Sequence, residues 1–266
     1  MPLIKDLLAQ GYLLTRILKA LNVNKSTYFN WLKWVPSPTE KRRLIFKKAV
    51  MQIWSNNKMY GHRRISMYSK TNEQTPTMSN YMALKLMRQL NIRSIMVKRY
   101  RKPAAKNNYV QRENIIKKFD DLSGGWSTDI TYLQLVNRQW VYLATAYNPE
   151  TRSVLSYKIG KQMTSELALA PILDALKHFR NPHIIHSDMG SQYTSFNFED
   201  VLKTNKIKHS YSLKGYPYDN GRIEAFHSIL KREMIYQRKF RSIDEIQLAV
   251  GNYIYWFNNE RISFVQ

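Results

Sequence analysis

Three acidic residues stand where they could together support chemistry on a phosphodiester. Asp129 lies in the strand-like run WSTDITYL, Asp188 follows the apolar run PHIIH, and Glu224 opens a helical pattern, with 35 residues between it and Asp188. Cleaving a phosphodiester requires neutralising charge on the attacking, leaving and equatorial oxygens, which two divalent cations about 4 Å apart can do. Mg²⁺ prefers hard oxygen ligands. We therefore take these three carboxylates as candidate catalytic residues and as ligands for two Mg²⁺ ions, with Mn²⁺ as a substitute.

Each of these acids has an ordinary explanation when it is taken alone. An Asp in a strand run is commonly a turn or edge residue, and a Glu at a helix start interacts favourably with the helix dipole. The hypothesis depends on the three occurring together. Lys231 follows Glu224 by seven residues on the same expected helix. It is therefore expected on the same helix face as Glu224, where it would point toward a bound phosphate. Gln192 and Tyr193, close behind Asp188, are further candidates for contact with the DNA backbone.

The surrounding patterns predict how these acids are positioned. Three strand-like runs separated by turns form a plausible antiparallel meander, and helices then alternate with two further strands. This order indicates an α/β protein with an RNase H-like mixed five-stranded sheet and flanking helices. Pro171 predicts a kink or a later start in the first of the helices. The expected strands are 126–135, 140–147, 153–159, 183–187 and 207–213, and the expected helices are 165–179, 196–203, 222–238 and 243–257.

Charge separates the front of the chain from the rest. The net charge is +23, and residues 1–124 carry 25 Lys and Arg against 6 Asp and Glu. Each Lys or Arg that meets a phosphate releases counterions, so a polyanion is the natural partner of this half. A basic protein that is bound to the ribosome, or that is merely soluble, would also explain this charge.

Residues 1–35 suggest a helix-turn-helix, because a helical pattern is interrupted at 22–24 and resumes over 28–34 with Ser26 or Thr27 as its cap. An ordinary helical hairpin would give a similar pattern. The next expected units are a second basic helical unit (39–102), a linker (103–122) and the catalytic core (123–266). The candidate DNA contacts of the two front units are Thr27, Tyr28, Asn30, Lys33, Arg63 and Arg64.

Composition excludes several classes of protein. The chain has no cysteine, which removes disulfides, thiolate zinc sites and cysteine nucleophiles and fits a cytoplasmic location. The chain contains no apolar run of about 18 residues, which is the length that a membrane span needs. The N-terminus lacks the pattern of a secretion signal. At 266 residues and 44% hydrophobic content, the chain can build two or three folded units.

The motifs resemble the second-frame catalytic transposases of bacterial insertion sequences, in the DDE superfamily that includes retroviral integrases. The matching blocks are WSTDITYL, HSDMGSQYTS, SYSLKGYPYDNGRIEAFHSILKRE, TYFNWLK, YGHRRI, LMRQLNIRS and YWFNNER. The resemblance implies that Asp129, Asp188 and Glu224 form the metal-binding triad of a polynucleotidyl transferase. That enzyme would nick the ends of its element and transfer the 3′-hydroxyls into target DNA.

The resemblance also implies partners. They are the element's terminal repeats, the target DNA, and a front-frame protein, meaning one encoded by the upstream reading frame of the element, either separate or fused to this chain. Further copies of the chain are expected on the DNA, at the bacterial nucleoid. The chain ends at Gln266, soon after NNER, where members of that family continue, so we expect a truncated C-terminus. Two other functions fit parts of the sequence: a DNA-binding regulator without catalysis, and a hydrolytic RNase H-like nuclease.

Overall fold

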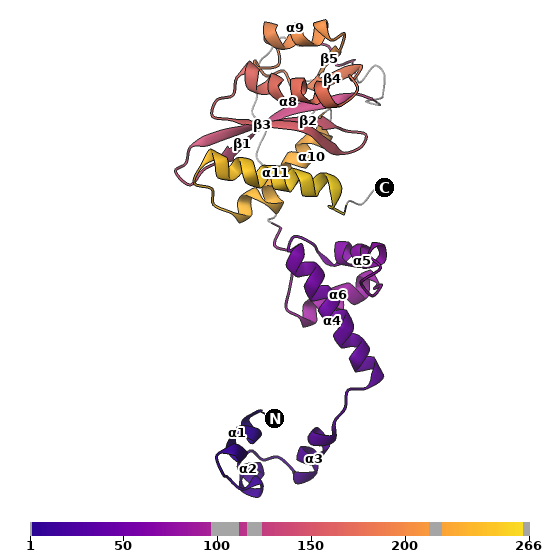
Figure 1. The fold of residues 1–266 in the computed structure, drawn as a ribbon, viewed down its shortest axis with the longest axis vertical. Helices are drawn as coiled ribbons and strands as arrows, with labels where there is room; N and C mark the ends of the chain where they lie inside the picture. The colour runs from indigo at the N-terminus through magenta and orange to yellow at the C-terminus, as the bar shows by residue number, and fades with distance from the viewer. Residues whose placement is uncertain (1, 97–111, 116–123, 213–219, 263–266) are drawn as a thin grey trace. The chain divides into compact units, whose positions relative to one another are not determined.

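The computed structural model describes residues 2–96, 112–115, 124–212 and 220–262. Close contacts separate the chain into two units, Met1–Arg93 and Ser94–Gln266, which are drawn in Figure 1. The expected catalytic core lies within the second unit. The predicted linker 103–122 falls largely outside the described residues, and the boundary near residue 35 stays a prediction.

The first three helices form a small core of their own. They are α1 (Pro2–Ala9), α2 (Leu14–Ala20) and α3 (Lys25–Lys33). Ile4, Ile17, Leu18 and Tyr28 are buried together between them. Asn22 adopts φ 50° in the turn between α2 and α3, a conformation that Asn tolerates well. The predicted helix, turn and helix are therefore present.

Two details of this segment differ from the sequence-based expectation. Helix α3 begins at Lys25 with Asn24 as its N-cap, rather than after Ser26 or Thr27. Tyr28 is buried among the apolar side chains of α1 and α2, so the prediction that it faces DNA is wrong. Its ring packs with Ile4, Ile17 and Leu18 and completes their small apolar core.

The rest of the first unit contains three more helices, α4 (Pro38–Asn56), α5 (His62–Thr71) and α6 (Asn80–Gln89). The start of α4 is a capping box: the Glu40 N–H donates to Ser37 Oγ at 3.2 Å, and the Ser37 N–H donates to Glu40 Oε2 at 2.8 Å. Pro38 suits the first turn because its missing N–H would have no helical partner there. The Pro-Ser-Pro segment thus starts a helix sharply.

The second unit is built on one mixed sheet in the order β3-β2-β1-β4-β5. Strands β1, β2 and β3 are an antiparallel meander, whereas β4 pairs parallel to β1 and β5 pairs parallel to β4. The predicted RNase H-like sheet is confirmed. The strands are β1 (Trp126–Gln134), β2 (Trp140–Asn148), β3 (Ser153–Gly160), β4 (Ile184–Ser187) and β5 (Lys208–Tyr211).

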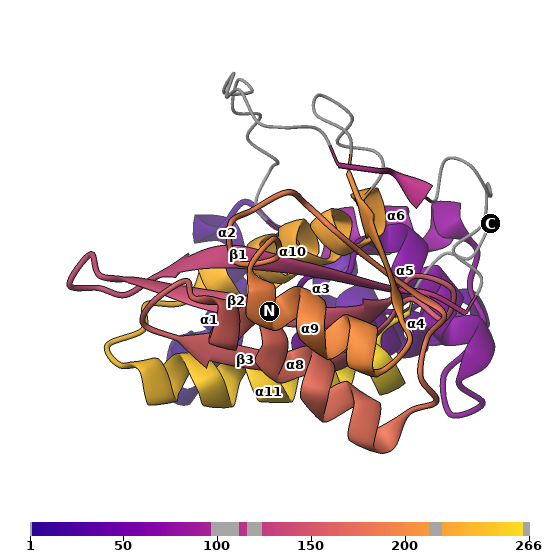
Figure 2. The ribbon, with the colours of Figure 1, turned by 90° about the horizontal axis from the view of Figure 1, so that it is seen from above.

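Helices cover both faces of this sheet (Figure 1). One face packs on α8 (Ser165–His178) and α9 (Phe196–Thr204). The other packs on α10 (Gly221–Glu233), the 3₁₀ turn η1 (Ile235–Gln237) and α11 (Ile243–Asn259). Figure 2 looks onto the sheet and shows α10 along β1 and α11 along β3. Within the described ranges, no helix is both long and apolar enough to cross a membrane.

Two helices depart from the predicted boundaries. Helix α8 begins at Ser165, capped by Thr164, and carries Pro171 inside it, so the later start does not occur. Helix α10 ends at Glu233, well before the predicted Arg238, because Met234 leaves the helical region with φ −132° and ψ −55°. The chain then turns into η1, which shapes one wall of a groove described below.

Candidate active site

The sheet register brings two of the three predicted acids side by side. Ser127 of β1 lies beside His186 of β4 in the parallel pairing. Two residues further along, this register leads to Asp129 on β1 and to Asp188 just past the end of β4. Asp188 directly follows the last residue of β4, at the carboxyl edge of the strand. The predicted meeting of a first-strand and a fourth-strand aspartate therefore has a structural basis in the strand order.

The surroundings of Asp188 make its ionisation costly. Burial of its carboxyl group, and then the nearby charge of Asp129, raise the pKa of Asp188 from 3.8 to about 6, although the Gly190 N–H lowers it by donating to Oδ1 at 2.9 Å. A Cβ on Gly190 would lie 2.2 Å from Gln192 Nε2, so glycine leaves room for that side chain. Two hard carboxylates held together in this way are a donor set that suits a divalent cation, which would offset their repulsion.

A histidine that the sequence analysis did not single out as a site residue fixes Asp129. His227 of α10 is buried, with Nδ1 3.2 Å from Asp129 Oδ2 and Nε2 3.0 Å from Thr145 Oγ1. Asp129 and Thr145 are cross-strand partners in β1 and β2. Because an ionised carboxylate only accepts, Nδ1 is the donor to Asp129, while Nε2 pairs with the Thr145 hydroxyl. One imidazole therefore joins α10 to both central strands at the carboxylate.

The start of α10 is anchored beside the same residue. The Asn220 side-chain amide donates to the carbonyl of Thr128 at 3.2 Å, one position before Asp129. Glu224 lies in the first turn of this helix, three residues before His227, and its side chain is exposed. Glu224 thus belongs to the helix that docks on the carboxylate side of the sheet.

The structure does not assemble a complete metal cage. Among the residues it describes, no group of three or more His, Asp or Glu side chains gathers closely enough to hold an ion. Asp129 and Asp188 form a pair, and the participation of Glu224 as a ligand stays a prediction.

Two predicted DNA contacts prove to be part of the interior. Tyr193 is 0% exposed and packs edge-on against Phe198, with ring centroids 5.3 Å apart. Its burial and then the nearby charge of Asp129 raise the pKa of Tyr193 well above its usual value. Gln192 is also buried and folds over Gly190. We correct both assignments: Tyr193 at 0% and Gln192 at 8% exposure belong to the interior next to the site, and too little of their surface is accessible for a contact with DNA in this conformation.

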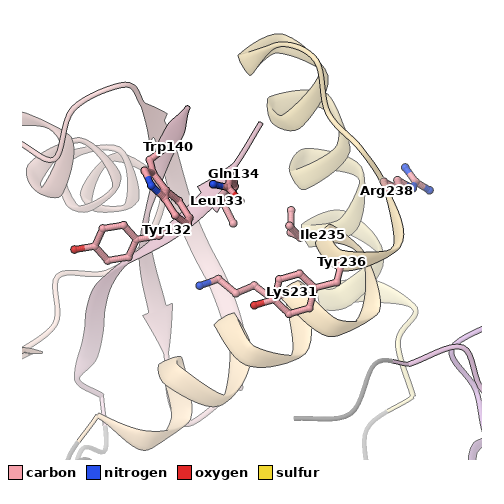
Figure 3. A pocket seen from close by; sticks show the side chains of 8 residues that line it. All are labelled: Tyr132, Leu133, Gln134, Trp140, Lys231, Ile235, Tyr236 and Arg238. Carbon is pink, nitrogen blue, oxygen red and sulfur yellow. The ribbon is translucent and has the colours of Figure 1, made fainter. Parts of the chain in front are cut away.

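Lys231 follows Glu224 by seven residues and lines a groove further along β1, with Tyr132 and Trp140 on the opposite side (Figure 3). Its contact with a phosphate stays a prediction.

In the first unit, Asn30, Lys33 and Arg63 are exposed and Thr27 is half-buried. The Arg64 guanidinium lies over the ring of Tyr60, 5.5 Å from its centroid. These five residues remain available as predicted DNA contacts.

The strand order and the helices that cover both faces of the sheet define an RNase H-like core, with an aspartate pair at the edge between two parallel strands. Two protein-family models, both described as "Integrase core domain", match residues 123–217 and 224–265 of this chain. A putative transposase InsK for insertion sequence element IS150 from Escherichia coli K12 is 30% identical, over 96% of this chain and 91% of the relative. The chain therefore belongs to the insertion-sequence transposases of the DDE integrase-like superfamily.

More distant similarities were also found. The IS600 uncharacterized 31 kDa protein of Shigella sonnei is 28% identical over 91% of both chains. The crystal structure of the catalytic core domain of BIV integrase is 20% identical, covering 52% of this chain and 86% of that chain, with a TM-score of 0.43.

Proposed function

We propose that the second unit of this DNA transposase cleaves phosphodiesters at the ends of its element and joins the freed 3′-hydroxyls to target DNA. Asp129, Asp188 and Glu224 are the proposed ligands for divalent cations. The observation that carries the proposal is the aspartate pair on adjacent parallel strands, with His227 tying the helix of Glu224 to the same point. The membership of the chain in the transposase family supports the same reaction class.

When bound, two Mg²⁺ ions, or Mn²⁺ in their place, would supply Lewis-acid stabilisation of the charge that develops on the phosphate oxygens. The protein's own groups orient the ligands. His227 Nδ1 holds Asp129 Oδ2, and the Gly190 N–H holds Asp188 Oδ1. The second oxygen of Asp129, Oδ1, accepts the Ile130 N–H at 2.8 Å, so these contacts together fix the orientation of both carboxylates. Partners of this kind commonly change metal affinity or activity 10- to 100-fold when they are removed.

The proposed reaction has two displacement steps at phosphorus. In the first, a water oxygen forms a P–O bond as the bond from phosphorus to the 3′-oxygen of the element breaks, and the 3′-oxygen leaves as a hydroxyl. In the second, this hydroxyl loses its proton and forms a bond to a target phosphorus, as the target's own P–O3′ bond breaks. Each step exchanges one P–O bond for another, so no oxidant or energy source is needed.

The first unit is the proposed DNA-recognition part. Asn30 and Lys33 are exposed on α3, the second helix of the helix-turn-helix, and Arg63 is exposed on α5. The proposed partners are the element's terminal repeats, the target DNA, a front-frame protein or fusion, and further copies of this chain. The proposed location is the nucleoid of the bacterial cytoplasm.

Strand transfer of a labelled element end by the full-length chain, in the presence of Mg²⁺, tests the proposal. Asp188→Asn should abolish joining and leave DNA binding unchanged, whereas Asp200→Asn, the same change at an exposed site on α9, should be neutral. Unchanged joining by Asp188→Asn would remove this residue from the catalytic set. Cleavage without any joined product would identify a nuclease, and binding with neither activity would identify a regulator.

A further inference from the structure

A groove of about 600 Å³ opens beside the end of β1, beyond the aspartate pair. Tyr132, Gln134 and Trp140 form the wall from the sheet, and Lys231, Tyr236 and Arg238 come from α10 and the segment after it. Figure 3 shows the Lys231 side chain extending from α10 toward Tyr132 and Trp140, across the space between the two walls. Leu133 and Ile235 are buried and supply the apolar lining.

Three large aromatic side chains along this groove remain accessible to solvent. Tyr132 is 48%, Trp140 51% and Tyr236 59% exposed. Tyr132 and Trp140 meet edge to face, with ring centroids 6.2 Å apart, so one ring holds the other in place. A pre-ordered aromatic surface can take a planar ring at little cost in conformational entropy.

The charge of the groove selects the kind of ligand. Among the described residues that line it, two are cations, Lys231 and Arg238, and none is Asp or Glu. Cations interleaved with exposed aromatic rings are the combination by which proteins bind single-stranded nucleic acid: phosphates meet the cations, and bases stack on the rings. Duplex DNA keeps its bases stacked internally, so the aromatic side chains favour an unpaired strand.

The groove lies at a suitable distance from the candidate active site. His227 contacts Asp129, and Lys231 lies by Tyr132, so β1 and α10 run in the same direction from the site to the groove. Three residues of strand, from Asp129 to Tyr132, span about 10 Å. Seven residues of helix, from Glu224 to Lys231, span a similar rise of about 10 Å. A strand whose phosphodiester reacted at the aspartates would reach the groove within a few nucleotides.

We propose that this groove binds the unpaired DNA strand next to the reacting phosphodiester, with bases stacked on Trp140 and Tyr236 and phosphates held by Lys231 and Arg238. The proposal deepens the proposed function and rests on it. It assigns to the groove a strand already separated from its complement.

Photochemical cross-linking of the full-length chain locates the strand directly. Single-stranded oligonucleotides carrying one 5-iodouracil are bound in EDTA, which prevents cleavage, then irradiated, and the attached peptides are identified by mass spectrometry. The expected cross-links are to Tyr132, Trp140 or Tyr236. Cross-links confined to other parts of the chain would overturn the proposal.

Affinity measurements separate base stacking from charge. A 12-mer with bases should bind more tightly than an abasic 12-mer of equal length, and Trp140→Ala or Tyr236→Ala should reduce that advantage about 5-fold or more, since stacking contributes 1–3 kcal/mol per base. Tyr255→Ala is the matched control, because Tyr255 is 66% exposed on α11, outside the groove. Circular dichroism checks that each variant folds, and Tyr236→Ala serves if Trp140→Ala does not.

The possible results are distinguishable from failure of the proposed function. Equal binding of abasic and ordinary strands, or equal competition by polyglutamate, would show a charge-only site open to acidic peptides and would overturn the stacking proposal. If the groove variants lose nothing while Asp188→Asn still abolishes joining, the groove proposal fails and the catalytic one stands. Cross-links in the groove together with normal joining by Asp188→Asn would support the strand-binding groove and remove Asp188 from the reaction.

Discussion

The imidazole of His227 lies 3.2 Å from the carboxylate of Asp129 and connects helix α10 to strand β1, which carries the first of the three proposed metal ligands. Its other nitrogen contacts Thr145, so the ring can rotate only by breaking one of two buried contacts. The position of α10 and the orientation of Asp129 are therefore linked. Glu224, one turn earlier on α10, shares this restraint.

Replacing His227 tests this link. His227→Ala should lower the strand-transfer rate about 10- to 100-fold and raise the Mg²⁺ concentration needed for half-maximal rate, as expected when a ligand's hydrogen-bond partner is lost. His227→Asn, which keeps a donor, should recover part of the activity. His178→Ala is the control, since His178 is exposed. A rate loss without any change in Mg²⁺ dependence would contradict an effect through Asp129.

The Asp188 carboxyl should titrate with a pKa of about 6 in metal-free protein, as followed by carbon-13 NMR of the side chain. Asp129→Asn removes a neighbouring negative charge and should lower this pKa, whereas Asp200→Asn should leave it unchanged. Addition of Mg²⁺ should also lower it, because the ion competes with the proton.

The same shift predicts how the stability of the metal-free protein depends on pH. The folded-state pKa of Asp188 lies above its unfolded value of 3.8, so the folded protein binds more protons between those two values. The contribution of Asp188 to the free energy of unfolding should fall as the pH rises from about 4 through 6. Urea unfolding of the chain and of Asp188→Asn across this range measures the difference; parallel curves would contradict the shift.

A buried ion pair joins α10 to the end of α11. Arg261 donates to Glu233 through Nε and Nη2, both at 2.9 Å, and the Tyr253 hydroxyl donates to Glu233 at 2.9 Å. Arg261→Ala would leave a buried carboxylate without its cation, which should cost about 3–5 kcal/mol. Hydrogen exchange in α10 and α11 should become faster. Arg180→Ala, at an exposed position, is the control, and unchanged exchange would mean that other contacts hold these helices together.

The first unit offers a contrast between surface and core residues. Lys33→Ala should weaken binding to the terminal repeat and reduce the salt dependence of binding by about one ion, while the fold is retained. Tyr28→Ala should instead destabilise α1–α3, because Tyr28 is in their core. Gel-shift titrations at several salt concentrations, with circular dichroism, separate the two effects. Loss of binding by a folded Tyr28→Ala would restore its predicted DNA contact.

The sequence was sufficient to predict the sheet and the aspartate pair for a definite reason. Strand runs near Asp129 and Asp188 are strongly patterned, and the order of strands and helices restricts the topology to few choices. The role of His227 could not be predicted in this way. Its only sequence signal is the i+3 spacing from Glu224, and its partner Thr145 becomes identifiable only through the register of β1 with β2.

The solvent exposure of individual side chains could not be predicted from the sequence. Tyr28 and Tyr193 are amphipathic residues beside polar neighbours, so the same letters suit a DNA contact or a core position. Their burial follows from packing against α1 and α2 in one case and Phe198 in the other. The end of α10 was also misjudged, because no Gly or Pro marks Met234 as the point where the helix stops.

Iron-directed cleavage tests the proposed metal triad most directly, because it reports the surroundings of a bound cation without requiring activity. Fe²⁺ bound in place of Mg²⁺, with ascorbate and peroxide, releases hydroxyl radicals that cut the backbone near its ligands. We predict cuts close to Asp129, Asp188 and Glu224, all suppressed by excess Mg²⁺ and by Asp188→Asn. Cuts near the two aspartates with none near Glu224, in the presence of DNA as well as in its absence, would contradict the triad.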